Sequence, residues 1–421
     1  MGVVRVLHLA DLHLDSPMRG MAAHDGAPQT VMSCTREAFV NAVRFALTEQ
    51  IDMVLIAGDV YDSDWQDFST GVFFASQLSL LREADIPVIL IRGNHDAASV
   101  ISRDLPLPAG TTVLSHEQPQ TVALEDLGVA VHGQSFASRE VRANLASAYP
   151  PALAGLHNIG LLHTSLAGHP EHDPYAPCSP DDLERLGYDY WALGHIHEPS
   201  RVAEPALAHY AGCVQGRSVR ECGPRGGLVV ELQPGERPEV QPVAFDVLRW
   251  AVADVDCSQL KTFEEMHAAA SHRLDEMLAS ASGRPLACRL RLVGESELHN
   301  RLLGEGDRVR AELIALANDL APEAIWLGAV QVNTLPTKAR ERHLDPELQS
   351  TLEDVLGDPQ TLAELRAMLV QIRTRVPEAL IVKRGPLAIL DHDDAAIARA
   401  LELASARLEL ALDPVTGEAV L

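Results

Sequence analysis

Five short motifs place potential metal ligands directly after apolar segments of the chain. Three follow VVRVLHLA, DMVLIA and PVILIR, and two follow NIGLL and YWAL. Apolar runs of this length are typical of buried strands. The side chains that follow them are Asp11, His13, Asp59, Asn94, His163, His195 and His197. In open α/β folds, ligands bind where the carboxyl ends of parallel strands share one edge, so we expect all seven to converge on a metal site there.

The last motif, GHIH, could be either a pair of metal ligands or a pair of ordinary surface histidines. In an extended backbone, residues i and i+2 point the same way, so His195 and His197 would face one spot. Gly194 would let the backbone approach whatever lies there. Two solvated loop histidines are the plainer interpretation of this pair alone, as a capping aspartate or a turn asparagine is for the other motifs. The five motifs together favour metal binding, because each plain explanation must hold separately.

The mixture of ligand types indicates which kind of metal site to expect. Cysteine is absent from the set, which disfavours a structural zinc site. Seven candidates exceed the needs of one tetrahedral ion, and a carboxylate such as Asp59 can bridge two ions. Imidazole, carboxylate and amide oxygen together suit two divalent ions, and the histidines favour manganese over magnesium. Asp11 and Asp59 cancel only part of the charge of two such ions, so the site would attract a phosphate and activate water for attack on phosphorus.

The bulk composition restricts the class of protein. The chain has 421 residues, which predicts two or three domains. Its formal charge of −25 excludes a generally basic nucleic-acid wrapper but leaves room for local phosphate contacts. Six scattered cysteines without a CxxC pair suit reduced thiols. We expect a cytoplasmic protein without a membrane segment, because no apolar run is long enough and the N-terminus lacks signal-peptide features.

The elements that must position these motifs alternate between strand and helix in the first half of the chain. Helical periodicity covers residues 35–50 and 68–82, between the first three strands, which predicts a largely parallel sheet covered by helices. The segment 232–242 is punctuated by proline and glycine and is expected to be a linker. After it, strands flank a helix expected over residues 263–280, forming a small α+β unit.

The last part of the chain carries helical signals. Leucines recur at helical spacing from about residue 336 onward, including Leu362, Leu365 and Leu369, and a last helix is expected from Asp393 to about Leu412. We therefore expect three regions, over residues 1–240, 246–335 and 336–421. Amphipathic helices of this kind either pack within the chain or offer a face to a partner.

The motif series resembles the signature of calcineurin-like metallophosphoesterases, with all five motifs present and in order. Within that superfamily the chain is similar to DNA-repair nucleases related to the SbcD subunit of bacterial SbcCD. The chain resembles the YhaO-type branch most clearly in three stretches: DLHLDSP at 11–17, HTSLAGHPEHDPYAPCS at 163–179 and YDYWALGHIHEP at 188–199. The resemblance implies an α/β fold, a metallophosphoesterase-type β-sandwich flanked by helices, with a small α+β capping domain and a helical C-terminal region.

The resemblance also implies roles for the site residues. Asp11, His13 and His197 would hold one metal ion, Asn94, His163 and His195 would hold the second, and Asp59 would bridge them. His95 would contact the phosphate and protonate the leaving oxygen, oriented by Asp96. Some relatives carry a histidine three residues after the bridging aspartate, where this chain has Asp62, so the way the phosphate is held there stays open. The roles of His169, His172, Arg217 and Arg220 also stay open between substrate contacts and ordinary surface positions.

The resemblance implies a metal-dependent exonuclease-type phosphodiesterase acting on DNA ends, as part of a repair complex. Its partners would be an SMC-like coiled-coil ATPase of the SbcC or YhaN kind, docked on the C-terminal helices, and a second copy of the chain. One alternative is a phosphatase or cyclic-nucleotide phosphodiesterase of the same superfamily, although the long chain beyond the catalytic core disfavours a small substrate. A non-catalytic scaffold is the other, and the intact ligand set disfavours it.

Overall fold

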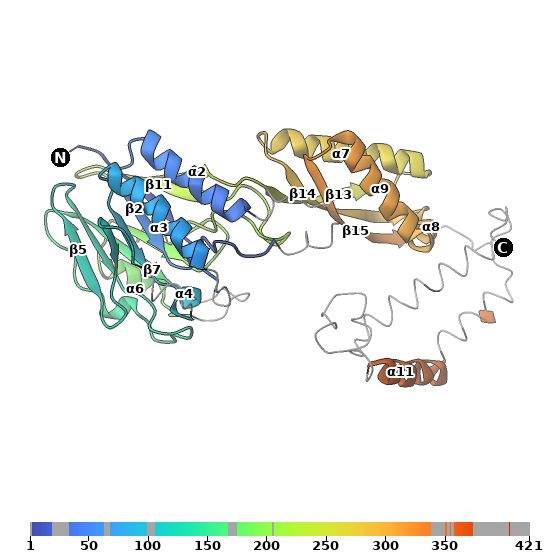
Figure 1. The fold of residues 1–421 in the computed structure, drawn as a ribbon. Helices are drawn as coiled ribbons and strands as arrows, with labels where there is room; N and C mark the ends of the chain where they lie inside the picture. The colour runs from blue at the N-terminus through green and yellow to red at the C-terminus, as the bar shows by residue number, and fades with distance from the viewer. Residues whose placement is uncertain are drawn as a thin grey trace. The chain divides into compact units, whose positions relative to one another are not determined.

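The computed structural model describes residues 2–18, 33–62, 68–98, 106–166, 175–203, 206–337, 350–351, 354, 358–373 and 404. The chain divides into two compact units (Figure 1). The first comprises Met1–Ala251 with Ala281–Ala287, and the second comprises Val252–Ser280 with Cys288–Leu421. Among the described residues, no helix combines the length and the apolar character needed to cross a membrane.

The first unit is a sandwich of two six-stranded sheets. One sheet contains β1 (Val4–Leu9), β2 (Met53–Ala57), β3 (Val88–Ile91), β4 (Thr111–Val113), β11 (Gly226–Leu232) and β12 (Glu239–Ala244), in the order β12-β11-β1-β2-β3-β4. The other contains β5 (Gln120–Leu124), β6 (Val129–Gly133), β7 (His157–His163), β8 (Tyr190–Gly194), β9 (Ser200–Ala203) and β10 (Ala208–Tyr210), in the order β5-β6-β7-β8-β10-β9. Strands β1 to β4 run parallel, as do β6, β7, β8 and β10. The predicted β-sandwich is thus confirmed.

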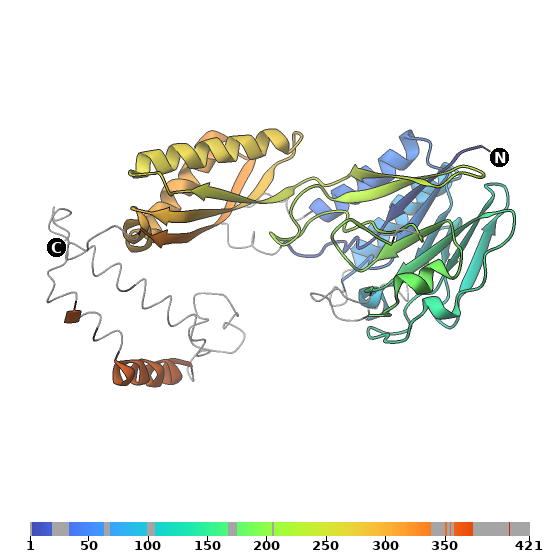
Figure 2. The same cartoon turned by 180° about the vertical axis from the view of Figure 1, so that it is seen from behind.

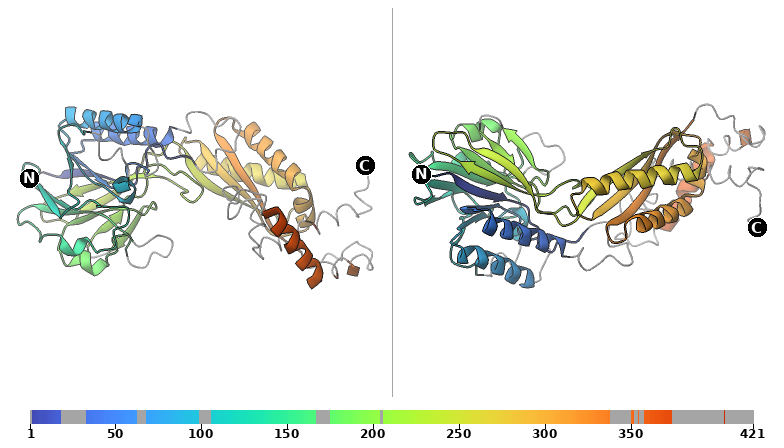
Figure 3. Two further views of the ribbon diagram at one scale, coloured as in Figure 1. Left: turned by 60° about the horizontal axis from the view of Figure 1, so that its bottom comes forward. Right: turned by 90° about the horizontal axis from the view of Figure 1, so that it is seen from above.

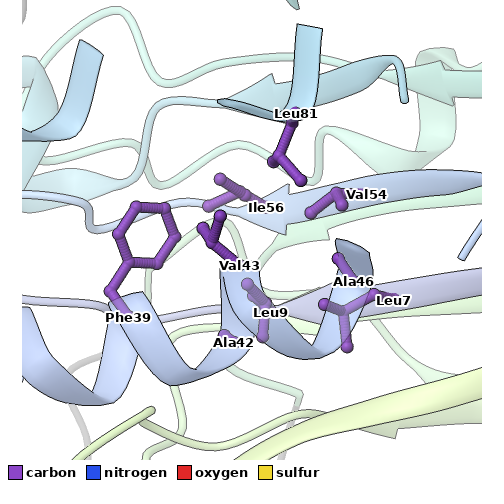
Figure 4. A pocket seen from close by; sticks show the side chains of 9 residues that line it. All are labelled: Leu7, Leu9, Phe39, Ala42, Val43, Ala46, Val54, Ile56 and Leu81. Atoms are coloured by element: carbon purple, nitrogen blue, oxygen red, sulfur yellow. The ribbon is translucent and has the colours of Figure 1, made fainter. Parts of the chain in front are cut away.

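Side chains alternate along the central strands between two apolar layers. In β1, Leu7 and Leu9 belong to the layer beneath helices α2 (Cys34–Thr48) and α3 (Phe68–Glu83), whereas Val6 belongs to the layer between the sheets. Figure 3 shows the two helices side by side over the first sheet. A small pocket in their layer is lined only by apolar side chains, with Phe39 and Val43 of α2 lying against the strands (Figure 4), so we assign it to the core.

The structure corrects the expectation of a single parallel sheet. The first three motifs follow β1, β2 and β3 of one sheet, whereas the last two follow β7 and β8 of the other. The motifs still meet, because the sheets pack face to face and β2 lies against both β7 and β8. A strand buried on both faces reads as the same apolar run in either sheet, so the runs alone did not reveal two sheets.

The shorter elements complete the first unit. Helix α4 (Asn94–Ala98) begins at the metal-ligand motif after β3, and α6 (Pro180–Glu184) and the 3-10 turn η1 (Ala146–Ala148) pack on the outer face of the second sheet. The helices predicted over 35–50 and 68–82 are confirmed as α2 and α3. The linker predicted over 232–242 is wrong, because residues 239–242 belong to β12, which pairs with β11. Pro242 misled the prediction, since proline is tolerated in an edge strand such as β12.

The second unit contains a three-stranded sheet in the order β13-β14-β15. Its strands are β13 (Arg249–Asp256), β14 (Leu286–Ser296) and β15 (Ile325–Pro336), and its helices are α7 (Phe263–Ser280), α8 (His299–Gly304) and α9 (Gly306–Leu320). Figure 2 shows the helices against the sheet, where Met266, Leu274 and Leu313 are buried. The predicted helix over 263–280 is confirmed with the same bounds. Helices α8 and α9 and strand β15 were not predicted.

The C-terminal part of the chain contributes helix α11 (Pro359–Arg373) to the described structure. It includes the predicted positions Leu362, Leu365 and Leu369. Leu369 is buried, but Met368, Val370 and Ile372 are 61, 48 and 49% exposed. The predicted helix from Asp393 to Leu412 lies almost wholly outside the described residues.

Candidate metal centre

The first group of metal-binding atoms comes from both sheets. Asp11 and His13 follow β1, and His197 follows β8. Their ligand atoms all lie within 4.8 Å of one another, and the Nε2 atoms of His13 and His197 are 3.2 Å apart. Asp11 and His13 are buried, and His197 is half-buried. His197 therefore lies beside Asp11 and His13, although more than 180 residues separate it from them in the sequence.

The hydrogen bonds of these two histidines show that the group fits a cation. His13 Nδ1 lies 2.8 Å from Asp62 Oδ1, and His197 Nδ1 lies 2.7 Å from Glu221 Oε1. A carboxylate only accepts, so each of these contacts favours the tautomer that carries the proton on Nδ1 and presents the lone pair of Nε2. Two lone pairs facing each other at 3.2 Å repel unless a positive ion lies between them. The donor set, with a carboxylate on the far side of each ring, therefore fits a metal ion.

A second group surrounds His163 at the end of β7. Asp11, Asp59 and His163 bring ligand atoms within 4.8 Å of one another. His163 Nδ1 lies 2.8 Å from the Ala57 carbonyl oxygen, while Nε2 lies 2.9 Å from Asn94 Oδ1 and 3.5 Å from Asp59 Oδ2. Both atoms beside Nε2 of His163 are thus oxygen atoms that can accept a hydrogen bond or bind a metal ion. Burial opposes a charge on this ring, but Asp59 and Asp11 outweigh it and raise the pKa of His163 to about 9. The group attracts a cation, whether a proton or a metal ion.

His195 lies beside the second group. Its ring centroid is 5.2 Å from that of His163, and its backbone N–H donates to both oxygens of Asp11 at 3.1 and 3.0 Å. The ring of His197 instead lies 5.0 Å from that of His13. The expectation that both rings face one spot from an extended strand is wrong, because β8 ends at Gly194 and His195 has a φ of 101°. All seven predicted ligands nevertheless belong to one connected cluster.

The backbone around the cluster adopts conformations that L-residues seldom take. Asp11, His13 and Asp59 have φ values of 49°, 41° and 53°. Positive φ is uncommon outside glycine, and strained residues of this kind gather at functional sites. The glycine of the last motif allows the close approach that the sequence suggested: a Cβ on Gly194 would lie 2.0 Å from the Ala57 carbonyl oxygen.

Asp96 has a different role from the predicted one. Its carboxylate accepts backbone N–H bonds from Val60, Tyr61 and Gly93 at 3.2, 3.0 and 3.1 Å. It thus ties the loop after β2 to the loop after β3. Asp62 faces His95, with 3.3 Å between Asp62 Oδ1 and His95 Nδ1. The ring of His95 thus contacts Asp62, while both oxygens of Asp96 accept backbone N–H groups.

Several polar residues around the ligands were missed or left open by the sequence. Glu221, which contacts His197, was not predicted. Arg217 pairs inside the protein, with 2.9 Å from Nη1 to Ser16 Oγ and 3.4 Å from Nη2 to Glu221 Oε1. Arg220 is exposed. His169 and His172 lie outside the described residues.

Binding of metal to this centre should release protons. Near neutral pH, well below its pKa of about 9, the ring of His163 in EDTA-treated protein holds a proton that an ion must displace. Affinity for Mn²⁺ should therefore rise as the pH is raised toward about 9. Calorimetric titration in two buffers of different ionisation enthalpy would measure the proton count, with smaller release at higher pH as the control. Identical heats in both buffers would contradict this assignment.

Comparison with known proteins shows which family models and relatives the chain matches. Residues 4–199 match the family model described as calcineurin-like phosphoesterase, and residues 250–335 match the middle domain of the metallophosphoesterase YhaO. Bacillus subtilis YhaO is 32% identical over 296 residues, covering 68% of this chain and 71% of that protein.

Two further relatives are named for DNA processing. The SbcD subunit of the nuclease SbcCD from Bacillus subtilis is 24% identical over 294 residues, covering 60% of this chain and 73% of that protein. The DNA double-strand break repair protein Mre11 of Aeropyrum pernix is 28% identical over 257 residues, covering 57% of this chain and 60% of that protein. With the sandwich fold and the converging ligands, these matches show that the chain belongs to the calcineurin-like metallophosphoesterase family, among relatives that include YhaO, SbcD and Mre11.

Proposed function

We propose that the protein is a metal-dependent phosphodiesterase that degrades DNA from its ends, as the nuclease component of a repair complex. The observation that supports this proposal most strongly is the length of the chain that matches a nuclease subunit. The match to SbcD covers 60% of this chain, a longer part than the phosphoesterase core at residues 4–199. A phosphatase for small substrates needs the core alone, so the longer match favours a polymeric substrate.

The ligands divide between two ions, for which we favour Mn²⁺. Asp11, His13 and His197 would hold one ion, and Asn94, His163 and His195 would hold the other. Asp59 would contact both ions, which is supported by the position of its Oδ2 atom, 3.9 Å from His13 Nε2 and 3.5 Å from His163 Nε2. Bound ions would supply positive charge for a phosphate and lower the pKa of an attacking water.

His95 supplies the proton for the leaving oxygen in this proposal. Its side chain is 31% exposed, so substrate can reach it, whereas the ligand His13 beside it is buried. Asp62 Oδ1 lies 3.3 Å from Nδ1 and would hold that side of the ring, which leaves Nε2 to face the substrate. The proton moves from Nε2 to the oxygen that departs from phosphorus, so the departing alcohol leaves neutral.

The proposal is tested by offering three substrates to the purified protein. End-labelled linear duplex, a cyclic nucleotide and bis-nitrophenyl phosphate are each incubated with Mn²⁺, Mg²⁺ or EDTA. We expect Mn²⁺-dependent release of label from the duplex and none with EDTA. Hydrolysis of the cyclic nucleotide without any cleavage of the duplex would favour the small-substrate alternative. Metal binding without hydrolysis of any substrate would favour the scaffold.

The C-terminal region is proposed to dock on an SMC-like ATPase. A chain with a formal charge of −25 has little general affinity for DNA, because such affinity depends on cationic contacts that release counterions. A partner would supply the DNA-binding affinity that this chain lacks. Helix α11 offers exposed apolar side chains at Met368 and Ile372, one turn apart on the same face, and at Val370 on another face; the spacing of the first two suits a helix-in-groove contact. Similarity to SbcD-like nucleases also supports a homodimer, which light scattering would test.

Deletion of residues 340–421 should separate docking from catalysis. We expect the shortened chain to keep its metals and its hydrolysis of bis-nitrophenyl phosphate, and to lose both co-purification with the ATPase and ATP-dependent duplex cleavage. Replacing Met368, Val370 and Ile372 by serine should weaken the same association. Leu335→Ser, at a 58% exposed site on β15, is the matched control. A shortened chain that still binds the ATPase would place the docking site elsewhere.

A further inference from the structure

The two groups of metal-binding side chains differ in what holds their histidine rings. His163 Nδ1 donates to a backbone carbonyl, that of Ala57. The rings of His13 and His197 are instead held by side-chain carboxylates, those of Asp62 and Glu221. A backbone carbonyl is fixed by the β2 strand to which Ala57 belongs, whereas a carboxylate depends on its own contacts. The rings of His13 and His197 therefore depend on two side chains that do not hold the ring of His163.

A single arginine joins the two carboxylates. Arg217 lies 3.8 Å from Asp62 Oδ2 and 3.4 Å from Glu221 Oε1, and its backbone N–H donates to Glu221 Oε2 at 2.6 Å. Ser16 completes the link, because its hydroxyl donates to Asp62 Oδ2 and accepts from Arg217 Nη1 at 2.9 Å. The three charged side chains are only 15, 19 and 13% exposed, so solvent screens their attraction weakly. They form one ion-pair network behind the histidines.

Two members of this network compete for the Nδ1 atom of His197. Arg217 Nη2 lies 3.2 Å from His197 Nδ1, while Glu221 Oε1 lies 2.7 Å from the same nitrogen. A guanidinium only donates, so a bond from Arg217 would place the ring proton on Nε2, where it would block metal binding. The shorter contact to the Glu221 carboxylate draws the proton to Nδ1 and frees Nε2. Asp62 acts in the same way on His13.

We propose that Asp62 and Glu221, joined by Arg217, are positioning residues for the ion held by Asp11, His13 and His197. The inference rests on the two-ion site of the proposed function. Loss of either carboxylate weakens that ion selectively, because the tautomer and direction of its imidazoles are no longer fixed. The ion beside His163 keeps its affinity.

The test is a Mn²⁺ titration of the full-length Glu221→Gln protein. Glutamine keeps the size of the side chain but removes the charge that pairs with Arg217. We expect wild-type protein to bind two ions, and the variant to bind one as tightly as before and the other about 10–100-fold more weakly. Electron paramagnetic resonance gives an independent signature: two ions about 3.5–4 Å apart are exchange-coupled, whereas a lone ion shows an isolated manganese spectrum.

Two further variants make the result decisive. Asp62→Asn should cause the same selective loss through His13, and it carries the test if Glu221→Gln fails to fold by circular dichroism. Glu231→Gln is the matched control, because Glu231 also pairs with an arginine, Arg5, but on the β1–β11 ladder. Unchanged affinity for both ions in the folded variants, or equal weakening of both, would overturn the inference. Wild-type protein that binds fewer than two ions would instead overturn the proposed function.

Discussion

Asp59→Asn is expected to abolish phosphodiester hydrolysis and to reduce bound metal from two ions per chain toward zero. Asp59 is buried, and its carboxylate stands between the two histidine groups, 3.9 Å from His13 Nε2 and 3.5 Å from His163 Nε2. The amide removes negative charge that both ions share. Loss of a ligand to one ion, as in His13→Ala, should leave more of the other ion bound.

Asparagine is the informative replacement because it preserves the fold. Asp59 has a φ of 53°, a left-handed conformation that asparagine also tolerates. Its Oδ1 atom can still accept the backbone N–H of His95, which Asp59 Oδ1 accepts at 2.9 Å. Metal content would be measured by mass spectrometry after dialysis, beside the rate on bis-nitrophenyl phosphate. Asp126→Asn, in an exposed turn after β5, is the control. A variant with two bound ions and full activity would refute the bridging role.

The convergence of the candidate ligands was predictable because their signal is local. Each lies within a few residues of an apolar strand, as Asp11 does after β1 and His163 at the end of β7. Glycines mark where backbones must approach, and Gly194 does so against Ala57. Such features depend on neighbouring residues in the chain, so a pattern of residue types can reveal them.

The arrangement of the strands was not predictable in the same way. Strands such as β2 and β8 are buried on both faces, so their residue types do not indicate to which sheet each strand belongs. Sheet membership is decided by pairing partners far along the chain, as β1 pairs with β11 across more than 200 residues. The resemblance to a family, rather than the periodicity, indicated a sandwich.

The residues behind the ligands were hidden for a related reason. Asp62 contacts His13 from 49 positions away, and Glu221 contacts His197 from 24 positions away. Nothing in the spacing of a single carboxylate says which ring it will face. Asp96 shows the opposite case, because the family resemblance implied that it orients His95, whereas its carboxylate accepts backbone N–H groups.

His95→Ala is expected to retain both ions and the fold while slowing DNA cleavage by ~10²–10⁴-fold, as for a lost general acid. The side chain is not one of the proposed ligands, and its backbone N–H bond to Asp59 survives the substitution. Asp62 keeps His13, Ser16 and Arg217 as partners, so its carboxylate is not left alone. The lost rate should therefore reflect proton transfer rather than disorder of the site.

The leaving group distinguishes an acid from a phosphate anchor. A deoxyribose oxygen needs a proton as it departs, whereas nitrophenolate departs readily as an anion, so His95→Ala should lose far less rate on bis-nitrophenyl phosphate than on DNA. His116→Ala, an exposed histidine of the same unit, is the control and should behave as wild type on both substrates. Metal content and thermal unfolding would be measured in parallel. Equal losses on the two substrates would mean that His95 positions the phosphate, because a binding contact acts whether or not the departing oxygen needs a proton.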